Sequence, residues 1–167
     1  MFAKFAHWTY YNSPIGWISI SGNGGSIAEI SFMDEAPTKF YNPVPDYLQD
    51  CVQQLDEYFK GDRRTFDLQL DMRKGTEFQQ QVWNELLKIP YGQTASYQKI
   101  AEKIQNPRAV RAVGAANGQN PLVLVVPCHR VIGANGDLVG FGGGMHRKKF
   151  LLALENPEQF GLQPPLF

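Results

Sequence analysis

Two neighbouring residues near the C-terminal end of the chain, Cys128 and His129, are the best candidates for chemistry. They lie in the run Pro127-Cys128-His129-Arg130-Val131. A thiolate is the most nucleophilic side chain near neutral pH, and we expect His129 and Arg130 to lower the Cys128 pKa. An imidazole can relay the thiol proton and a carboxylate can orient it, with Glu155 as one candidate. The alternative is a buried, inert cysteine.

The other cysteine and histidines do not suggest a metal site. Cys51 is the other of only two cysteines, and its place beside a helical apolar stripe predicts a small buried side chain. His7, His129 and His146 are scattered, with no paired ligand spacing. We therefore expect no metal site.

Three helices should precede the cysteine and position it. Thr76 and Gln79 form a capping-box signature, and apolar residues follow at helical spacing up to Pro90-Tyr91-Gly92. We expect a second helix over 97–104, capped by Ser96, and a third over 108–117. Short helices joined by a tight turn resemble a helix-turn-helix. A last helix should end at Glu155.

The third helix combines small residues with arginine. Arg108 and Arg111 lie among Ala109, Ala112, Gly114, Ala115 and Ala116. Small residues let a helix approach either another helix or a DNA groove, and the two arginines favour the groove. Nine basic and two acidic residues fall between Leu87 and Phe150, in a chain with zero formal net charge. This asymmetry favours a polyanionic partner.

The N-terminal part reads as a small sheet with a helix, so we expect an α+β protein. Strands are expected over Phe5–Tyr11, Gly16–Ser21 and Ser26–Phe32, a helix around 48–59, and a further strand over 66–70. The pattern changes near 71–75, which predicts an N-terminal domain over 1–73 and a C-terminal domain over 76–160. No apolar run is long enough to span a bilayer and no signal peptide is evident, so a cytoplasmic location is expected.

From about Thr76 to Glu155 the chain closely resembles the O6-alkylguanine-DNA alkyltransferases. The resemblance is carried, in order, by Arg111-Ala112-Val113-Gly114, Asn120-Pro121, the pentapeptide 127–131, the glycine loop 142–144 and Leu151-Leu152-Ala153-Leu154-Glu155. The N-terminal half matches in general build only.

The resemblance implies a role for particular residues. Cys128 would accept the alkyl group, His129 would activate it through a water, and Glu155 would partner His129. Asn120 would brace the active-site loop, Tyr97 would assist base rotation, and Arg111 would replace the flipped nucleotide. The DNA-facing set would be Arg108, Arg111, Ala112, Gly114, Ala115 and Arg130. The substrate pocket would contain Val123, Val131, Phe141, Gly142 and Gly143, with Phe141 standing where some members carry tyrosine.

The implied function is single-turnover, irreversible transfer of an alkyl group from O6-alkylguanine in double-stranded DNA to Cys128, by a monomer. No cofactor is expected, since the protein would itself be the acceptor. Two alternatives stay open: a non-catalytic helix-turn-helix protein, and a cysteine hydrolase, whose histidine usually lies far from its cysteine in sequence. Glycines 142–144 predict an open pocket wall that admits alkyl groups larger than methyl. On that premise, Gly143→Trp would plug the pocket selectively against benzyl.

Overall fold

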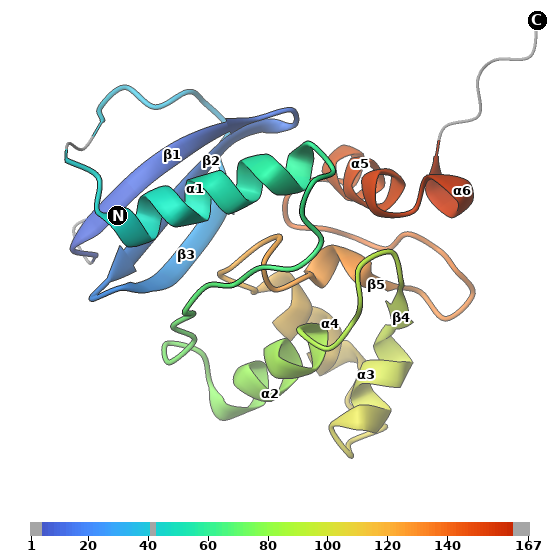
Figure 1. Ribbon diagram of the computed structural model, residues 1–167. Helices are drawn as coiled ribbons and strands as arrows, with labels where there is room; N and C mark the ends of the chain where they lie inside the picture. The colour runs from blue at the N-terminus through green and yellow to red at the C-terminus, as the bar shows by residue number, and fades with distance from the viewer. Residues whose placement is uncertain (1–4, 41–42, 162–167) are drawn as a thin grey trace, which may run out of the picture.

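A computed structural model describes residues 5–40 and 43–161, and it has the expected α+β architecture (Figure 1). Strands β1 (His7–Ser13), β2 (Gly16–Asn23) and β3 (Ser26–Phe32) form an antiparallel sheet in that order. Helix α1 (Asp46–Phe59) lies along one face of the sheet. The three predicted strands are confirmed, although β1 begins and ends two residues later than expected.

Successive side chains of a strand point to opposite faces of the sheet, so isoleucines two residues apart lie on one face and can pack on a helix. Ile18 and Ile20 of β2 and Ile30 of β3 are fully buried, and they meet apolar residues such as Leu48 and Leu55 from α1. Gly24 and Gly25 join β2 to β3 with φ angles of 58° and 90°. A two-residue hairpin turn of this kind needs positive φ at both positions, which glycine adopts without strain.

The predicted strand over 66–70 is wrong. Only Leu70 forms a bridge, to Ile27 of β3, through bonds from Ile27 N to Gln69 O and from Asp71 N to Ile27 O, both 2.8 Å. The physical reason is that two segments share the outer edge of β3. Farther along this edge, Ile30 exchanges hydrogen bonds with the chain just before the cysteine.

The C-terminal half is mainly helical. Its elements are α2 (Glu77–Leu86), β4 (Ala95–Ser96), α3 (Tyr97–Lys103), α4 (Val110–Gly118), the 3-10 helix η2 (Cys128–Arg130), β5 (Val131–Ile132), α5 (Met145–Glu155) and α6 (Pro157–Phe160). The capping box of Thr76 and Gln79 is confirmed, and the Ser96 hydroxyl accepts a 3.0 Å hydrogen bond from Lys99 N. Helix α4 begins two residues later than expected.

The parallel pairing of β4 with β5 was not expected. It sets Ala95 opposite Val131 and Ser96 opposite Ile132. The pairing turns Val131 into the core, where it is fully buried. One apolar cluster runs from the sheet and α1 through to the C-terminal helices, so the two halves share their interior, and the domain boundary near residue 74 stays a prediction.

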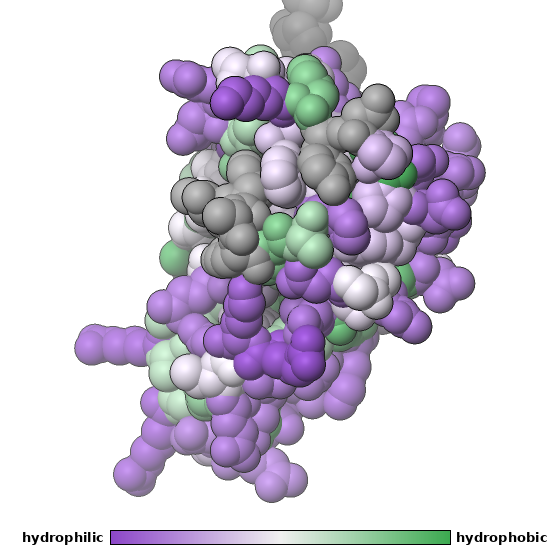
Figure 2. Space-filling view, turned by 90° about the vertical axis from the view of Figure 1, so that its left-hand side faces the viewer, coloured by the Kyte–Doolittle hydropathy of each residue, from purple (hydrophilic) through white to green (hydrophobic). Residues whose placement is uncertain are grey.

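Hydrophilic side chains dominate the face of the molecule shown in Figure 2, and apolar ones form small separate groups among them. That pattern is ordinary for a protein surface. Within residues 5–40 and 43–161, every helix is too short or too polar to cross a membrane.

Candidate active site

Cys128 begins η2 at the end of a tightly turned segment. Leu124 has a φ of 74°, which is unusual for a residue with a side chain, and Val125 N donates to Val123 O across it at 2.9 Å. The turn is held from the sheet: Ile30 N donates to Pro121 O at 2.8 Å, and Val123 N donates to Ile30 O at 3.2 Å. Such strained backbone persists where its surroundings fix it.

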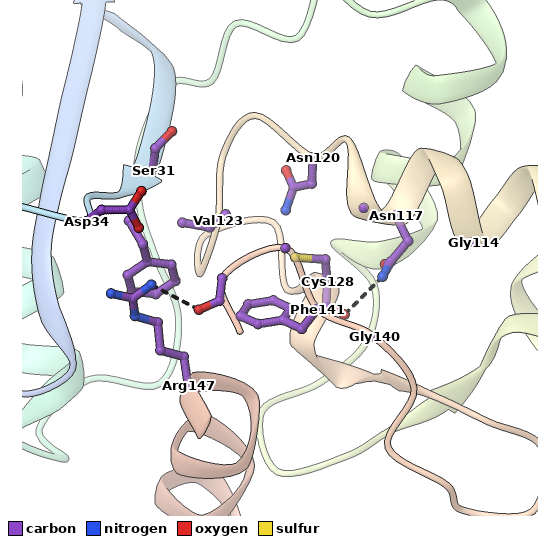
Figure 3. A pocket seen from close by; sticks show the side chains of 14 residues that line it. Ser31, Asp34, Gly114, Asn117, Asn120, Val123, Cys128, Gly140, Phe141 and Arg147 are labelled. Atoms are coloured by element: carbon purple, nitrogen blue, oxygen red, sulfur yellow. Dashed lines mark hydrogen bonds between the residues drawn. The ribbon is translucent and has the colours of Figure 1, made fainter. Parts of the chain in front are cut away.

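Two asparagines hold the same segment from the side of α4. Asn120 Nδ2 donates to Val126 O at 2.7 Å, and Asn120 Oδ1 accepts from Leu122 N at 2.9 Å. Asn117 Nδ2 donates to the carbonyl oxygen of Cys128 at 3.4 Å (Figure 3). Asn120 therefore lies where it can brace the loop, and Asn117 is a second brace that sequence reasoning missed.

Cys128 lines a pocket of about 340 Å³ at the junction of the two halves. In Figure 3 its side chain lies between Asn120 and Phe141. The other lining residues are Ser31, Phe32, Asp34, Gly114, Asn117, Gly118, Val123, Gly140, Gly142, Gly143 and Arg147. Four of the five predicted pocket residues belong to this wall. The N-terminal sheet also contributes to it, which the sequence did not indicate.

Val131 is the fifth predicted pocket residue; it was expected to act through backbone groups near it, and that role stays a prediction. Its side chain is fully buried and lies outside the pocket lining. Its carbonyl oxygen accepts a 2.7 Å hydrogen bond from Lys148 Nζ. The pairing of β5 with β4 is the reason, since it directs Val131 toward the core.

His129 and Glu155 form a buried hydrogen-bonded pair. His129 Nε2 lies 2.8 Å from Glu155 Oε2, and both side chains are almost completely excluded from solvent. Because Glu155 is ionised, Nε2 carries the proton and donates, which leaves Nδ1 as the basic nitrogen. Nδ1 is buried without a hydrogen-bond partner among the residues that the structure describes. Burial lowers the His129 pKa below 6.5, against the opposing pull of Glu155.

Arg130 does not face DNA, contrary to expectation. Its Nε donates to Glu155 Oε1 at 2.7 Å, its Nη2 to Glu155 Oε2 at 3.0 Å, and its Nη1 to Ile89 O at 2.7 Å. The physical reason is that a buried carboxylate requires a cationic, hydrogen-bonding partner. Burial alone would raise the Glu155 pKa, but His129 and Arg130 outweigh it and hold that pKa far below 4.5.

The expected lowering of the Cys128 pKa is also wrong. Burial raises this pKa above its ordinary value of 9.0, and it outweighs a hydrogen bond from Asn120, the charge of Lys148 and the N–H groups of Cys128 and His129. At rest, Cys128 is therefore a thiol and the adjacent His129 is a neutral imidazole. A thiolate at Cys128 requires another group to take up the thiol proton.

Lys148 is a further cation that sequence reasoning missed. It is fully buried in α5, and its Nζ donates to Val131 O at 2.7 Å and to Val139 O at 2.9 Å. Its charge favours a thiolate at Cys128, as noted above. The sequence held one signal: Lys148 precedes Glu155 by seven residues, two helical turns, so both share a helix face.

Helix α4 presents the predicted small-residue face to the outside. Arg111, Ala112 and Ala115 are exposed, as is Arg108 just before the helix, whereas the opposite face is buried. Gly114 packs against Tyr97, since a Cβ at Gly114 would lie 3.9 Å from the Tyr97 ring. Burial and then the charge of Cys128 raise the Tyr97 pKa, so the phenol stays protonated near the cysteine.

The glycine loop is not the open wall that the sequence suggested. A Cβ on Gly143 would lie 2.8 Å from both Phe141 and Phe32. Arg147 holds the loop, because its Nη1 donates to Gly143 O at 2.9 Å and its guanidinium lies 4.6 Å from the Phe32 ring centroid. At Gly142 the nearest atom to a Cβ, Gly118 O, would be 3.7 Å away. Of the three glycines 142–144, Gly142 therefore has the most room for a side chain.

Over the described ranges, no three of the histidine, cysteine, aspartate and glutamate side chains gather as metal ligands would. The site consists of a buried thiol, a histidine–carboxylate pair, two buried cations and a pocket reaching the exposed face of α4. This arrangement can generate a thiolate inside a pocket and direct it at an electrophilic carbon.

Comparisons with known proteins cover nearly the whole chain. The family described as "6-O-methylguanine DNA methyltransferase, DNA binding domain" matches residues 77–157, and the same family's "ribonuclease-like domain" matches residues 6–72. A methylated-DNA–protein-cysteine methyltransferase from Mycobacterium tuberculosis H37Rv is 47% identical over 152 residues, which cover 89% of this chain and 92% of the relative. One from Methanosarcina acetivorans is 44% identical over 154 residues, covering 89% and 97%.

Solved structures agree. The crystal structure of Mycobacterium tuberculosis OGT in complex with DNA has a TM-score of 0.83 and 47% sequence identity, covering 91% of this chain and 94% of that one. The structure of the Mycobacterium tuberculosis O6-methylguanine methyltransferase has a TM-score of 0.77 and 46% identity, covering 90% and 93%.

Proposed function

Since this chain belongs to the methylated-DNA–protein-cysteine methyltransferases and repairs DNA by direct reversal, we propose that Cys128 is its alkyl acceptor and O6-alkylguanine its substrate. One observation carries the assignment: Cys128 lines the pocket and is followed directly by the buried His129–Glu155 pair. Cys51, the other cysteine, is buried in the core.

In the proposed reaction, His129 Nδ1 takes the thiol proton, either directly or through a water. The sulfur then attacks the saturated carbon of the alkyl group, so that an S–C bond forms as the C–O6 bond breaks. Glu155 stabilises the imidazolium and Lys148 stabilises the thiolate. Guanine leaves with the bonding electrons on O6 and recovers a proton, for which the Tyr97 phenol is the proposed donor.

DNA is expected to bind along the exposed face of α4. The alkylated oxygen lies inside the duplex, so the nucleotide must leave the base stack to reach Cys128. Arg111, exposed in the first turn of α4, can fill the gap and meet the phosphates. Gly114 and Gly118 line the pocket as well as belonging to α4, so this helix connects the DNA surface to the acceptor. The proposed unit is a monomer.

An intact-protein mass spectrum after incubation with duplex DNA containing O6-methylguanine tests this proposal. The protein should gain the mass of one methyl group, and product should stop accumulating at one equivalent, because a thioether has no easy leaving path. Cys128→Ser should gain no mass while still binding DNA. Cys51→Ser is the matched control and should be methylated like the wild type. Continued turnover, or methylation of Cys128→Ser, would contradict the assignment.

A further inference from the structure

The carboxylate of Glu155 has a partner from the other half of the molecule. Tyr58 lies in the last turn of α1, and its hydroxyl donates to Glu155 Oε2 at 2.6 Å. The tyrosine is fully buried. It is 97 residues away from Glu155 in the chain, so no local pattern predicts the bond.

Tyr58 and His129 bind the same oxygen atom. Glu155 Oε2 accepts from the Tyr58 hydroxyl at 2.6 Å, from His129 Nε2 at 2.8 Å and from Arg130 Nη2 at 3.0 Å. A carboxylate oxygen offers about two lone pairs. Three donors therefore share the electron density of one oxygen, and the shortest of these bonds comes from the tyrosine.

The phenol is held in place as a permanent donor. Its ring packs against Phe59, Phe66 and Tyr91, with centroids 5.3, 5.5 and 6.2 Å away. Burial, and next the charge of Glu155, raise the Tyr58 pKa well above 10.0. The hydroxyl consequently stays protonated wherever the protein is folded and active.

Of the other charged and titratable groups around the histidine, Arg130 shares Glu155 Oε2 with Tyr58, whereas Lys148 and Tyr91 make their contacts elsewhere. Arg130 and Lys148 are the cations that face it, and Cys128 is its neighbour in η2. Tyr91 donates to Leu154 O rather than to Glu155, at 3.4 Å, and Arg64 lies over the Tyr91 ring at 5.2 Å. None of these groups binds the hydroxyl of Tyr58, so this bond can be changed separately.

We propose that Tyr58 is a positioning residue for alkyl transfer: its hydroxyl draws electron density from Glu155 Oε2 and thereby limits how strongly Glu155 retains a proton on His129. The imidazole is then neutral at working pH and free to take the proton of Cys128. The N-terminal half thus contributes to the chemistry through α1. This inference rests on the proposed function, in which His129 is the base.

The test is the pH dependence of the second-order rate constant for methyl transfer from duplex O6-methylguanine. In the wild type the rate should rise with pH as His129 loses its proton. Tyr58→Phe leaves Oε2 more basic, so the rising limb should move to higher pH by about 0.5 unit, a roughly threefold change in proton affinity. Tyr58→3-fluorotyrosine is a stronger donor and should move the limb to lower pH.

Tyr11→Phe is the matched control, because the Tyr11 hydroxyl donates to a carboxylate outside the site, Asp56 Oδ1, at 3.0 Å. It should leave the limb in place. A uniform loss of rate in Tyr58→Phe with an unmoved limb would show a merely structural role and overturn the inference, as would an equal shift in the control.

If Tyr58→Phe does not fold, the protein with 3-fluorotyrosine at position 58 is the test. If the rising limb of its pH profile stays in place or moves to higher pH, the inference is rejected. Failure of the proposed function looks different. In that case the wild type itself would not be methylated at Cys128, whatever residue stands at position 58.

Discussion

Arg130 and Glu155 form a two-point ion pair in the interior, with Nε–Oε1 and Nη2–Oε2 distances of 2.7 and 3.0 Å. Both side chains are almost completely excluded from solvent, at 7% and 1% exposure. The same carboxylate binds His129, the base of the proposed reaction, so the Arg130–Glu155 pair helps to hold this histidine in place. Arg130, which follows the proposed base His129 in sequence, thus pairs with a buried carboxylate in the interior of the protein.

Arg130→Ala should therefore destabilise the fold severely. It leaves a buried carboxylate with too few partners, a change that typically costs about 3–5 kcal/mol of unfolding free energy. Urea unfolding measures the effect. Arg73→Ala is the control, because Arg73 makes a similar two-point pair with Asp71 while 87% exposed, and it should change stability little. Equal effects of the two substitutions would show that burial of the first pair is unimportant.

Stability should fall in two steps as the pH decreases. Burial lowers the folded pKa of His129 below 6.5, so the unfolded chain takes up this proton first, and stability is lost as the pH falls below 6.5. Glu155 has a folded pKa far below 4.5, so its contribution is present above pH 4.5 and lost below it.

Unfolding free energies measured above pH 6.5, between 6.5 and 4.5, and below 4.5 check both steps. His129→Gln should remove the upper step and keep the lower one. A wild-type profile that stays flat between pH 6.5 and 4.5 would contradict the buried, neutral histidine.

Arg111→Ala should slow repair of duplex DNA about tenfold or more, while changing the reaction with free O6-methylguanine little. The reason is its proposed place in the base stack, which the free base does not require. Second-order rate constants with the two substrates measure the difference, and DNA binding should weaken as salt rises. Arg73→Ala, distant from α4 in sequence, is the control. Equal losses on both substrates would indicate a damaged fold instead.

The glycine loop should respond oppositely at neighbouring positions. Gly143→Trp should impair transfer of methyl and benzyl groups alike, because its Cβ would already collide with Phe141 and Phe32 at 2.8 Å. Gly142→Val has room near Gly118 O at 3.7 Å and should slow O6-benzylguanine more than O6-methylguanine by narrowing the pocket. Rate constants for both substrates decide. A selective effect at Gly143, or none at Gly142, would reject this view of the wall.

Several features of this protein follow from the sequence by itself, because they depend on neighbours along the chain. The capping box of Thr76 and Gln79 lies within one helical turn, and the hairpin turn needs only Gly24 and Gly25. Cys128 and His129 are likewise neighbours in the chain, so the sequence alone shows them side by side. Local features of this kind suffice for the α+β class and the candidate nucleophile, whereas the helix-turn-helix stays a prediction.

The tertiary structure alone decided the electrostatics of the site. Adjacent basic residues suggested a lowered Cys128 pKa, but burial raises this pKa. The sequence also suggested a DNA contact for Arg130, but the Arg130 guanidinium binds Glu155. Desolvation depends on everything packed around a group, and pairing with a residue far along the chain depends on topology. Tyr58 is the extreme case, because only the packing of α1 on the C-terminal half brings its hydroxyl to Glu155.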